Sequence, residues 1–187
     1  MLRGLINAVQ ALVLFVACAA FLEVRPVQAD DPAFLTFGAA AYDWNNLEDL
    51  QVEYRLEYRG EKLLGPIKPM VAAAGTLCFG RVFPLCDGAS TTGSGFFGAG
   101  GLIDIFFGNR IVFTPSTGAF YYTGGTNDLD LDYPLQFRMQ LELAYRFDDR
   151  SRIIAAVSRY ENFGLGDSNP GVESGILYYS IPFNKLF

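Results

Sequence analysis

A short segment near the C-terminal end of the chain gathers residue types that can hydrolyse an ester or bind an anion. Arg159, Glu161 and Asn162 lie close together, and Glu173 follows fourteen positions after Arg159. A carboxylate can act as a base, a guanidinium binds phosphate through its planar fork, and an amide can donate to an oxyanion. The chain contains no histidine. A serine nucleophile needs an adjacent base that titrates near neutral pH, and histidine is the usual one.

Two serines near this segment are candidate nucleophiles. Ser158 has the parity of the opposite strand face, whereas Ser168 lies in the following loop and can approach Glu161 or Glu173. A carboxylate of ordinary pKa is a poor base for a hydroxyl unless burial raises that pKa. Asn162 has two interpretations, as an oxyanion donor or as a turn residue that leads into a loop containing glycine.

The elements that must position these residues are β-strands. Apolar and polar residues alternate along 50–59 and 135–147, which predicts strands with one apolar and one charged face. The second segment is long enough to cross a bilayer with tilt, which takes about 9 to 11 residues. Weaker alternation extends the prediction to eight strands, at 33–44, 50–59, 67–77, 95–107, 111–123, 134–147, 152–162 and 173–187.

The connections between these strands alternate in length. Compact polar turns are expected at 108–110 and 148–151, and longer loops at 78–94, 124–133 and 163–172. Outer-membrane barrels have short periplasmic turns and longer extracellular loops. The segment 60–66 is longer than its expected periplasmic side suggests. The predicted fold is all-β, an eight-stranded antiparallel up-and-down outer-membrane β-barrel.

Alternation alone does not decide which face of the barrel points outward. A secreted lipocalin-like barrel places its apolar rows inside, around an apolar ligand. The mixed charges of Glu53, Arg55, Glu57 and Arg59 favour the opposite arrangement, because such side chains can pair within a narrow lumen. With apolar rows outward, Arg159, Glu161 and Glu173 share the lipid-facing side. An Arg159 bridge to Glu161 or Glu173 would lower the cost of a charge there.

Composition and the N-terminal segment define the compartment. Residues 1–29 read as a secretory signal peptide, which leaves 30–187 as one barrel domain. Cys78 and Cys86 then remain close in sequence, and a disulfide is expected in an oxidising compartment.

The net charge of -6 argues against a nucleic-acid partner. No metal or other cofactor is expected, and the acidic loop with Asp128, Asp130 and Asp132 is expected to be solvated.

The segment 158–173 resembles the active-site stretch of the outer-membrane lipid A 3-O-deacylases, the PagL-type acyloxyacyl hydrolases. That stretch reads His-x-Ser-Asn-Ala, with a Glu as far from its His as Glu173 is from Arg159. Aligned without gaps, the Asn falls on Asn162, the His on Arg159 and the Ser on Glu161. Shorter similarities at 37–43, 53–55, 136–138, 145–147 and 169–183 extend the resemblance over most of the chain.

The resemblance implies a barrel whose outward site removes the 3-linked acyl chain of lipid A. It places catalytic positions at Arg159, Glu161 and Glu173, two of them substituted, and substrate-binding positions at Asn162 and Asn169. The prediction is a catalytically degenerate relative in the bacterial outer membrane that interacts with lipid A or lipopolysaccharide or has a structural role. The alternatives are an active deacylase with an atypical site and a secreted lipocalin-like barrel. Whether the barrel forms a homodimer is left open.

Overall fold

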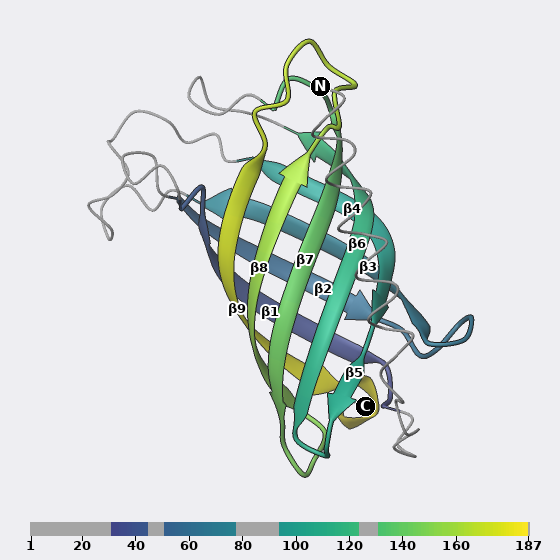
Figure 1. Ribbon diagram of the computed structural model, residues 1–187. Helices are drawn as coiled ribbons and strands as arrows, with labels where there is room; N and C mark the ends of the chain where they lie inside the picture. The colour runs from purple at the N-terminus through teal and green to yellow at the C-terminus, as the bar shows by residue number, and fades with distance from the viewer. Residues whose placement is uncertain (1–30, 45–50, 78–93, 124–130, 187) are drawn as a thin grey trace.

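The computed structural model describes residues 31–44, 51–77, 94–123 and 131–186. These residues form one antiparallel sheet (Figure 1). Its strands are β1 (Phe34–Tyr42), β2 (Gln51–Arg59), β3 (Ile67–Leu77), β4 (Gly95–Ile103), β5 (Ile105–Phe107), β6 (Ile111–Thr123), β7 (Leu135–Arg146), β8 (Arg152–Glu161) and β9 (Val172–Pro182). A 3-10 helix, η1, follows at Phe183–Lys185. Within the described residues, no helix is long and apolar enough to span a membrane.

The sheet closes on itself as a barrel. Strands that follow one another in the sequence pair, apart from β4 and β5, and β1 also pairs with β9 and β4 with β6. Both β4 and the short β5 pair with β6, so they are two parts of one barrel strand that breaks at Asp104. The nine segments therefore make eight barrel strands, as the sequence predicts. Among the described strands, closure gives each of the eight barrel strands a partner on both sides, while the short β5 segment itself pairs only with β6.

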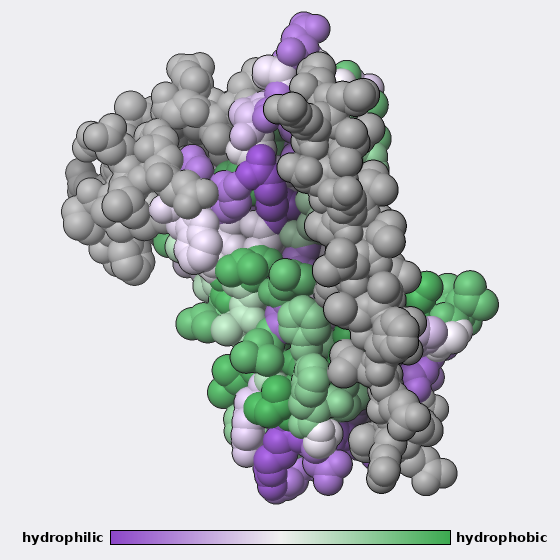
Figure 2. Space-filling view, viewed as in Figure 1, coloured by the Kyte–Doolittle hydropathy of each residue, from purple (hydrophilic) through white to green (hydrophobic). Residues whose placement is uncertain are grey.

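The strands present apolar side chains outward and polar side chains inward. Along β7, Leu141 and Leu143 are 47% and 57% exposed, whereas Gln140 and Glu142, which alternate with them, are buried. The space-filling view shows the outward apolar residues as a green band with hydrophilic residues above and below it (Figure 2). This arrangement is the reverse of a lipocalin-like barrel, whose apolar rows line the interior.

Ion pairs fill the middle of the lumen. Arg59 reaches Glu57 on its own strand and Glu142 across the barrel, each at 2.7 Å between nitrogen and oxygen. Arg138 contacts the other oxygen of Glu57 at 2.7 Å. Arg55 pairs with Glu53 and donates to Gln140 at 2.9 Å. Buried charges are tolerated when they are paired and hydrogen-bonded, so these contacts allow the strands to turn charged faces inward.

Aromatic rings pack the lumen above the ion pairs, toward the long loops. The rings of Phe96 and Tyr160 stack with centroids 4.2 Å apart, and Phe120 meets Tyr160 edge to face at 5.6 Å. The Arg138 guanidinium lies 4.6 Å from the centroid of Phe120, which joins this aromatic layer to the ion pairs. The lumen is therefore a packed core over most of its described length.

The barrel has two unlike ends, which we call the turn end and the loop end. The turn end carries the segments 60–66, 108–110 and 147–151 together with the start of β1 and the end of β9. At this end Asp31 accepts from Arg146 at 2.9 Å and from Arg152 at 2.5 Å. These contacts hold Asp31, which precedes β1, in the mouth of the barrel.

Asp104 explains why the predicted strand 95–107 is interrupted. Its carboxylate accepts from Lys68 at 2.9 Å, from Thr114 at 2.7 Å and from Arg152 at 2.9 Å. These donors lie on three different strands, and the break in pairing turns the carboxylate toward all of them at once. The sequence did not show this, because Asp104 looks like one more polar position in an alternating strand.

Two predictions fall on residues that the structure does not describe. The signal peptide at 1–29 and the disulfide between Cys78 and Cys86 both lie outside the described ranges.

The predicted final strand is too long, since β9 ends at Pro182 and η1 follows it. Proline lacks the N–H that would continue a ladder, which is consistent with this end point.

Replacing Glu142 with alanine should destabilise the barrel by about 3–5 kcal/mol, because the buried Arg59 would lose a partner. Urea unfolding from lipid vesicles, followed by tryptophan fluorescence, measures the change. Leu143→Ala on the lipid face of the same strand is the matched control and should lose much less. Equal losses for the two variants would contradict a supporting role for the lumen ion pairs.

Candidate functional site

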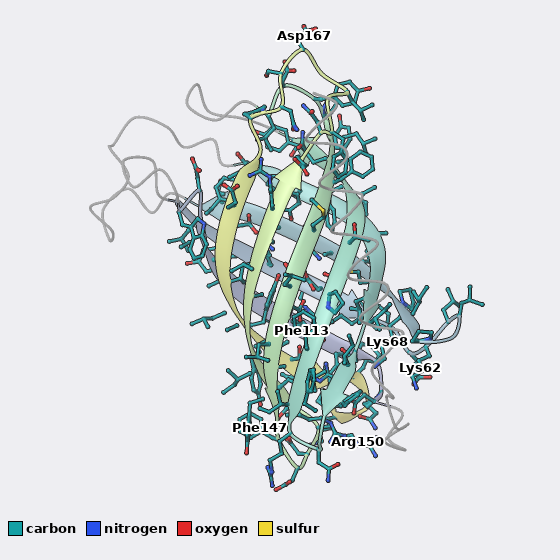
Figure 3. All side chains as sticks on the ribbon, in the orientation of Figure 1. Lys62, Lys68, Phe113, Phe147, Arg150 and Asp167 are labelled. Atoms are coloured by element: carbon teal, nitrogen blue, oxygen red, sulfur yellow. The ribbon has the colours of Figure 1, made fainter. Side chains whose placement is uncertain are left out.

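The predicted site lies at the loop end of the barrel, on its outer surface. Arg159 is near the end of β8 and Glu173 is at the start of β9, and the two residues are direct partners in the antiparallel register. Glu161 lies two residues beyond Arg159, on the same face. Asp167, labelled in Figure 3, marks the tip of the β8–β9 loop above this site, and Phe147 and Arg150 lie at the opposite end.

Arg159 is held between two carboxylates. Its Nη1 pairs with Glu173 Oε1, and its Nε lies 3.5 Å from Glu161 Oε2. The three side chains are partly covered, with 40% of Arg159, 29% of Glu173 and 15% of Glu161 exposed. We call these three residues the ionic triad. Its formal charge is -1, because one guanidinium balances only one of the two carboxylates.

The β8–β9 loop is shaped around the arginine. Gly171 has a φ of +62°, a conformation that residues with a Cβ rarely adopt. A Cβ at this position would also lie 2.6 Å from Arg159 Nη2, which is too close. The backbone angle favours glycine, and the short distance shows that the Arg159 guanidinium lies directly against the loop backbone.

The two asparagines hold the same loop together. Asn162 is buried, its Nδ2 donates to the carbonyls of Leu131 and Ser168 at 3.2 and 2.8 Å, and its Oδ1 accepts from the N–H of Gly164 at 2.8 Å. Asn169 Oδ1 accepts from the Asn162 N–H at 3.0 Å, and its Nδ2 lies 3.4 Å from Glu161 Oε2. Because both amide hydrogens of Asn162 are engaged, a substrate oxyanion would have to displace one of these carbonyls.

The candidate serines are placed differently from each other. Ser158 is buried on the lumen side, where its Oγ accepts from Arg55 Nη2 at 3.0 Å. Ser168 is exposed in the loop, where its backbone N–H donates to Asp132 Oδ2 at 2.6 Å and its carbonyl accepts from Asn162. Ser158 thus belongs to the lumen network, and Ser168 is anchored through its backbone.

Of the predicted acidic loop, only Asp132 is described. Asp132 has a φ of +63° and ties the β6–β7 connection to the β8–β9 loop through Ser168. Asp128 and Asp130 lie outside the described residues. Among the described residues, no group of three or more His, Cys, Asp or Glu is arranged to hold a metal ion.

Aromatic side chains flank the ionic triad, and the sequence analysis did not identify them. Trp44, just beyond β1, lies over Gly175, so that a Cβ at this glycine would be 2.9 Å from the indole ring. On the other side, the rings of Phe137 and Phe163 have centroids 5.2 Å apart. No local sequence signal identifies them, because the pairing of β1 with β9 brings Trp44 to Gly175, which in turn pairs with Val157, one outward position below Arg159.

A shallow, open apolar groove lies on the lipid-facing surface and begins at Val157, the next outward position of β8 after Arg159. It has a volume of about 270 Å³ and lies over β6, β7 and β8. The β8 residues Val157 and Ala155 are the next outward positions after Arg159 toward the turn end. The small side chain of Ala155 faces Leu143 and Leu177 on the neighbouring strands. The groove is lined by Phe113, Leu141, Glu142, Leu143, Ala155, Ala156 and Val157.

Together these features can bind a molecule with a polar head and an apolar chain. A guanidinium has five N–H donors, and the two ion pairs of Arg159 engage its Nη1 and Nε groups. Donors therefore remain for a phosphate or hydroxyl, although Glu161 and Glu173 weaken the attraction for an anion. The groove below offers an apolar surface that suits an aliphatic chain. The triad contains no hydroxyl or thiol that could act as a nucleophile.

The Arg159–Glu173 pair should show a coupling free energy of about 1 kcal/mol, at the upper end for exposed pairs because it is partly covered. A double-mutant cycle with Arg159→Ala and Glu173→Ala, read by urea unfolding in vesicles, measures it. Lys185 and Asp149 form a matched pair in water at 2.9 Å. Their coupling should be about 0.2–0.5 kcal/mol. A coupling at the triad no larger than this control would show that the bridge does not stabilise the site.

Comparison with solved structures shows the same fold. The crystal structure of the outer membrane enzyme PagL matches with a TM-score of 0.58 and 20% identity, over 80% of this chain and 99% of that chain. Neisserial surface protein A matches with a TM-score of 0.59 and 8% identity, over 81% and 97%. A de novo designed transmembrane β-barrel matches with a TM-score of 0.51 and 10% identity, over 82% and 98%.

Comparison of sequences gives the family. No curated protein sequence matches the chain. Residues 35–182 match the family described as Lipid A 3-O-deacylase (PagL). This range contains the whole ionic triad, its loop and the apolar groove. The chain belongs to the lipid A 3-O-deacylase (PagL) family and is a β-barrel of the bacterial outer membrane.

Proposed function

We propose that this barrel binds lipid A in the outer leaflet and does not hydrolyse it. The observation that carries the proposal is the ion-paired Arg159, held between Glu161 and Glu173. By the resemblance, Arg159 and Glu161 occupy the positions of the base and the nucleophile. A guanidinium stays protonated at any physiological pH, so it cannot accept a proton from a hydroxyl. A carboxylate at position 161 removes the hydroxyl as well.

The location of the site supports lipid A as the ligand. The loop end, with its long connections, is the extracellular end of an outer-membrane barrel, and lipid A belongs to that leaflet. The triad lies where a phosphorylated sugar head group would be, and the groove below extends toward the acyl chains. Arg159 offers guanidinium donors, and Trp44 and Phe163 add apolar ring surface at the same level.

Lipid A mass spectrometry tests the absence of hydrolysis. Cells that produce the protein should have the same lipid A mass profile as cells with an empty vector. Loss of one 3-hydroxyacyl chain from lipid A in the producing cells would overturn the proposal in favour of an active deacylase. Outer-membrane fractionation and heat-modifiable gel migration confirm in parallel that the protein is folded and correctly located.

The double substitution Arg159→His with Glu161→Ser should introduce deacylation. The register places position 159 directly opposite Glu173, so the carboxylate can orient the imidazole, and position 161 lies on the same face. The measurement is again the lipid A mass profile. The single variant Arg159→His, which lacks the hydroxyl, is the matched control and should remain inactive. Equal profiles for the two variants would show that the scaffold no longer supports the reaction.

Filling the groove should weaken lipid A binding. Ala155→Phe places a large ring between Leu143 and Leu177, where an acyl chain would lie. Native mass spectrometry of the detergent-released barrel with added lipid A should show several-fold less bound lipid. Ala73→Phe, at an outward position of β3 remote from the groove, is the control and should bind like the unaltered chain. Unchanged binding by Ala155→Phe would exclude the groove as the acyl site.

A further inference from the structure

The β2–β3 turn has a surface that the lipid A site does not explain. Its residues Leu63 and Leu64 are 77% and 74% exposed, more than any other large apolar residue that the structure describes. The turn lies at the periplasmic turn end, between Arg59 of β2 and Ile67 of β3. Two adjacent leucines exposed to this extent would be unfavourable in water.

The turn is an ordered hairpin that presents these leucines by its own hydrogen bonds. The Gly60 N–H donates to the Pro69 carbonyl at 2.8 Å, and the Leu63 N–H donates to the Ile67 carbonyl at 2.9 Å. The Ile67 N–H returns to the Leu64 carbonyl at 3.0 Å, and this closes a tight turn. Gly65, with a φ of +56°, supplies the left-handed position that such a turn requires.

The hairpin leaves the barrel wall sideways. Figure 1 shows it projecting beyond the outline of the barrel, whereas the β7–β8 turn continues along the strands at the bottom of the view. Lys62, labelled in Figure 3, marks the projecting hairpin. Its apolar surface continues the lipid-facing surface of β3, where Ile67 and Val71 are 42% and 46% exposed. The leucines therefore extend the membrane belt outward.

The other turns at the periplasmic end have different chemistry. The turn after β5 is Gly108-Asn109-Arg110, and the turn after β7 contains Asp148, Asp149 and Arg150. Arg110 and Asp148 join these two turns with an exposed ion pair of 2.9 Å. Side chains of this kind belong in water. Among the described turns of this end, the β2–β3 turn alone is tipped by leucines.

We propose that Leu63 and Leu64 insert into the periplasmic leaflet and anchor the hairpin among phospholipid acyl chains. The occupant is phospholipid because the leucines continue a surface that already faces lipid. The charged residues Glu61 and Lys62 precede the leucines and lie at the level of the head groups. The hairpin then acts as a lateral anchor that limits how far the barrel can shift or tilt in the bilayer.

Depth-dependent quenching of a tryptophan at the tip tests this anchor. The chain has one tryptophan, so Leu64→Trp is introduced together with Trp44→Phe. The protein is folded into phosphatidylcholine vesicles without lipid A, with and without bromine on the acyl chains near the head group. The emission of Leu64→Trp should lie at short wavelength and lose most of its intensity with the brominated lipid. Asn109→Trp in the same background is the matched control and should stay unquenched.

Two results would overturn the anchor. Emission like that of a water-exposed indole, unquenched by bromine, would place the hairpin in the periplasm. Short-wavelength emission that disappears when the protein is diluted with more lipid would show that a second copy of the chain covers the leucines. Heat-modifiable migration of each variant confirms folding. Because the vesicles contain no lipid A, the result is independent of the function proposed for the triad.

Discussion

The pairing of charged side chains inside the barrel is the interaction on which the rest of the structure depends. A membrane barrel must satisfy its backbone by closing the sheet, and a sheet of eight strands encloses a lumen that side chains can fill. Here the filling side chains are charged, and they are tolerated because Arg59 and Arg138 share the carboxylate of Glu57, with Glu142 completing the set. Once the polar faces turn inward, the apolar faces meet lipid.

The ionic triad is an exception to this inside-out polarity. It puts charge on the lipid side, where an arginine near the interface costs about 0 to 1 kcal/mol and one at the midplane about 2 to 4 kcal/mol. Its position at the end of β8, the two carboxylates and the loop backbone at Gly171 all reduce that cost. The binding role proposed for this site rests on the arginine held between the two carboxylates.

Sequence reasoning performed best where local pattern and tertiary constraint agree. Alternation along β2 and β7 predicted both strands, because one buried face enforces period two over a long strand, and the mixed charges of β2 predicted which face turns inward. Sequence reasoning did not predict the break at Asp104, where ion pairs to other strands accompany the interruption of backbone pairing. It also placed the end of β9 too late. It left Asn162 with two interpretations, and the structure shows its amide joining the loop to Leu131. Contacts between distant segments carry no local signal.

The sequence by itself determined the fold class and the shared strand face of Arg159, Glu161 and Glu173, because side-chain alternation in a strand is set by counting residues. The mixed charges on the opposite rows then predicted that this face points outward. Only the tertiary structure decided that Trp44 lies over Gly175, that Gly171 supports the guanidinium, and that a groove runs below the triad. These depend on the register between strands and on how loops fold over them. Register is a property of the closed sheet, since each pairing must agree with all the others around the barrel.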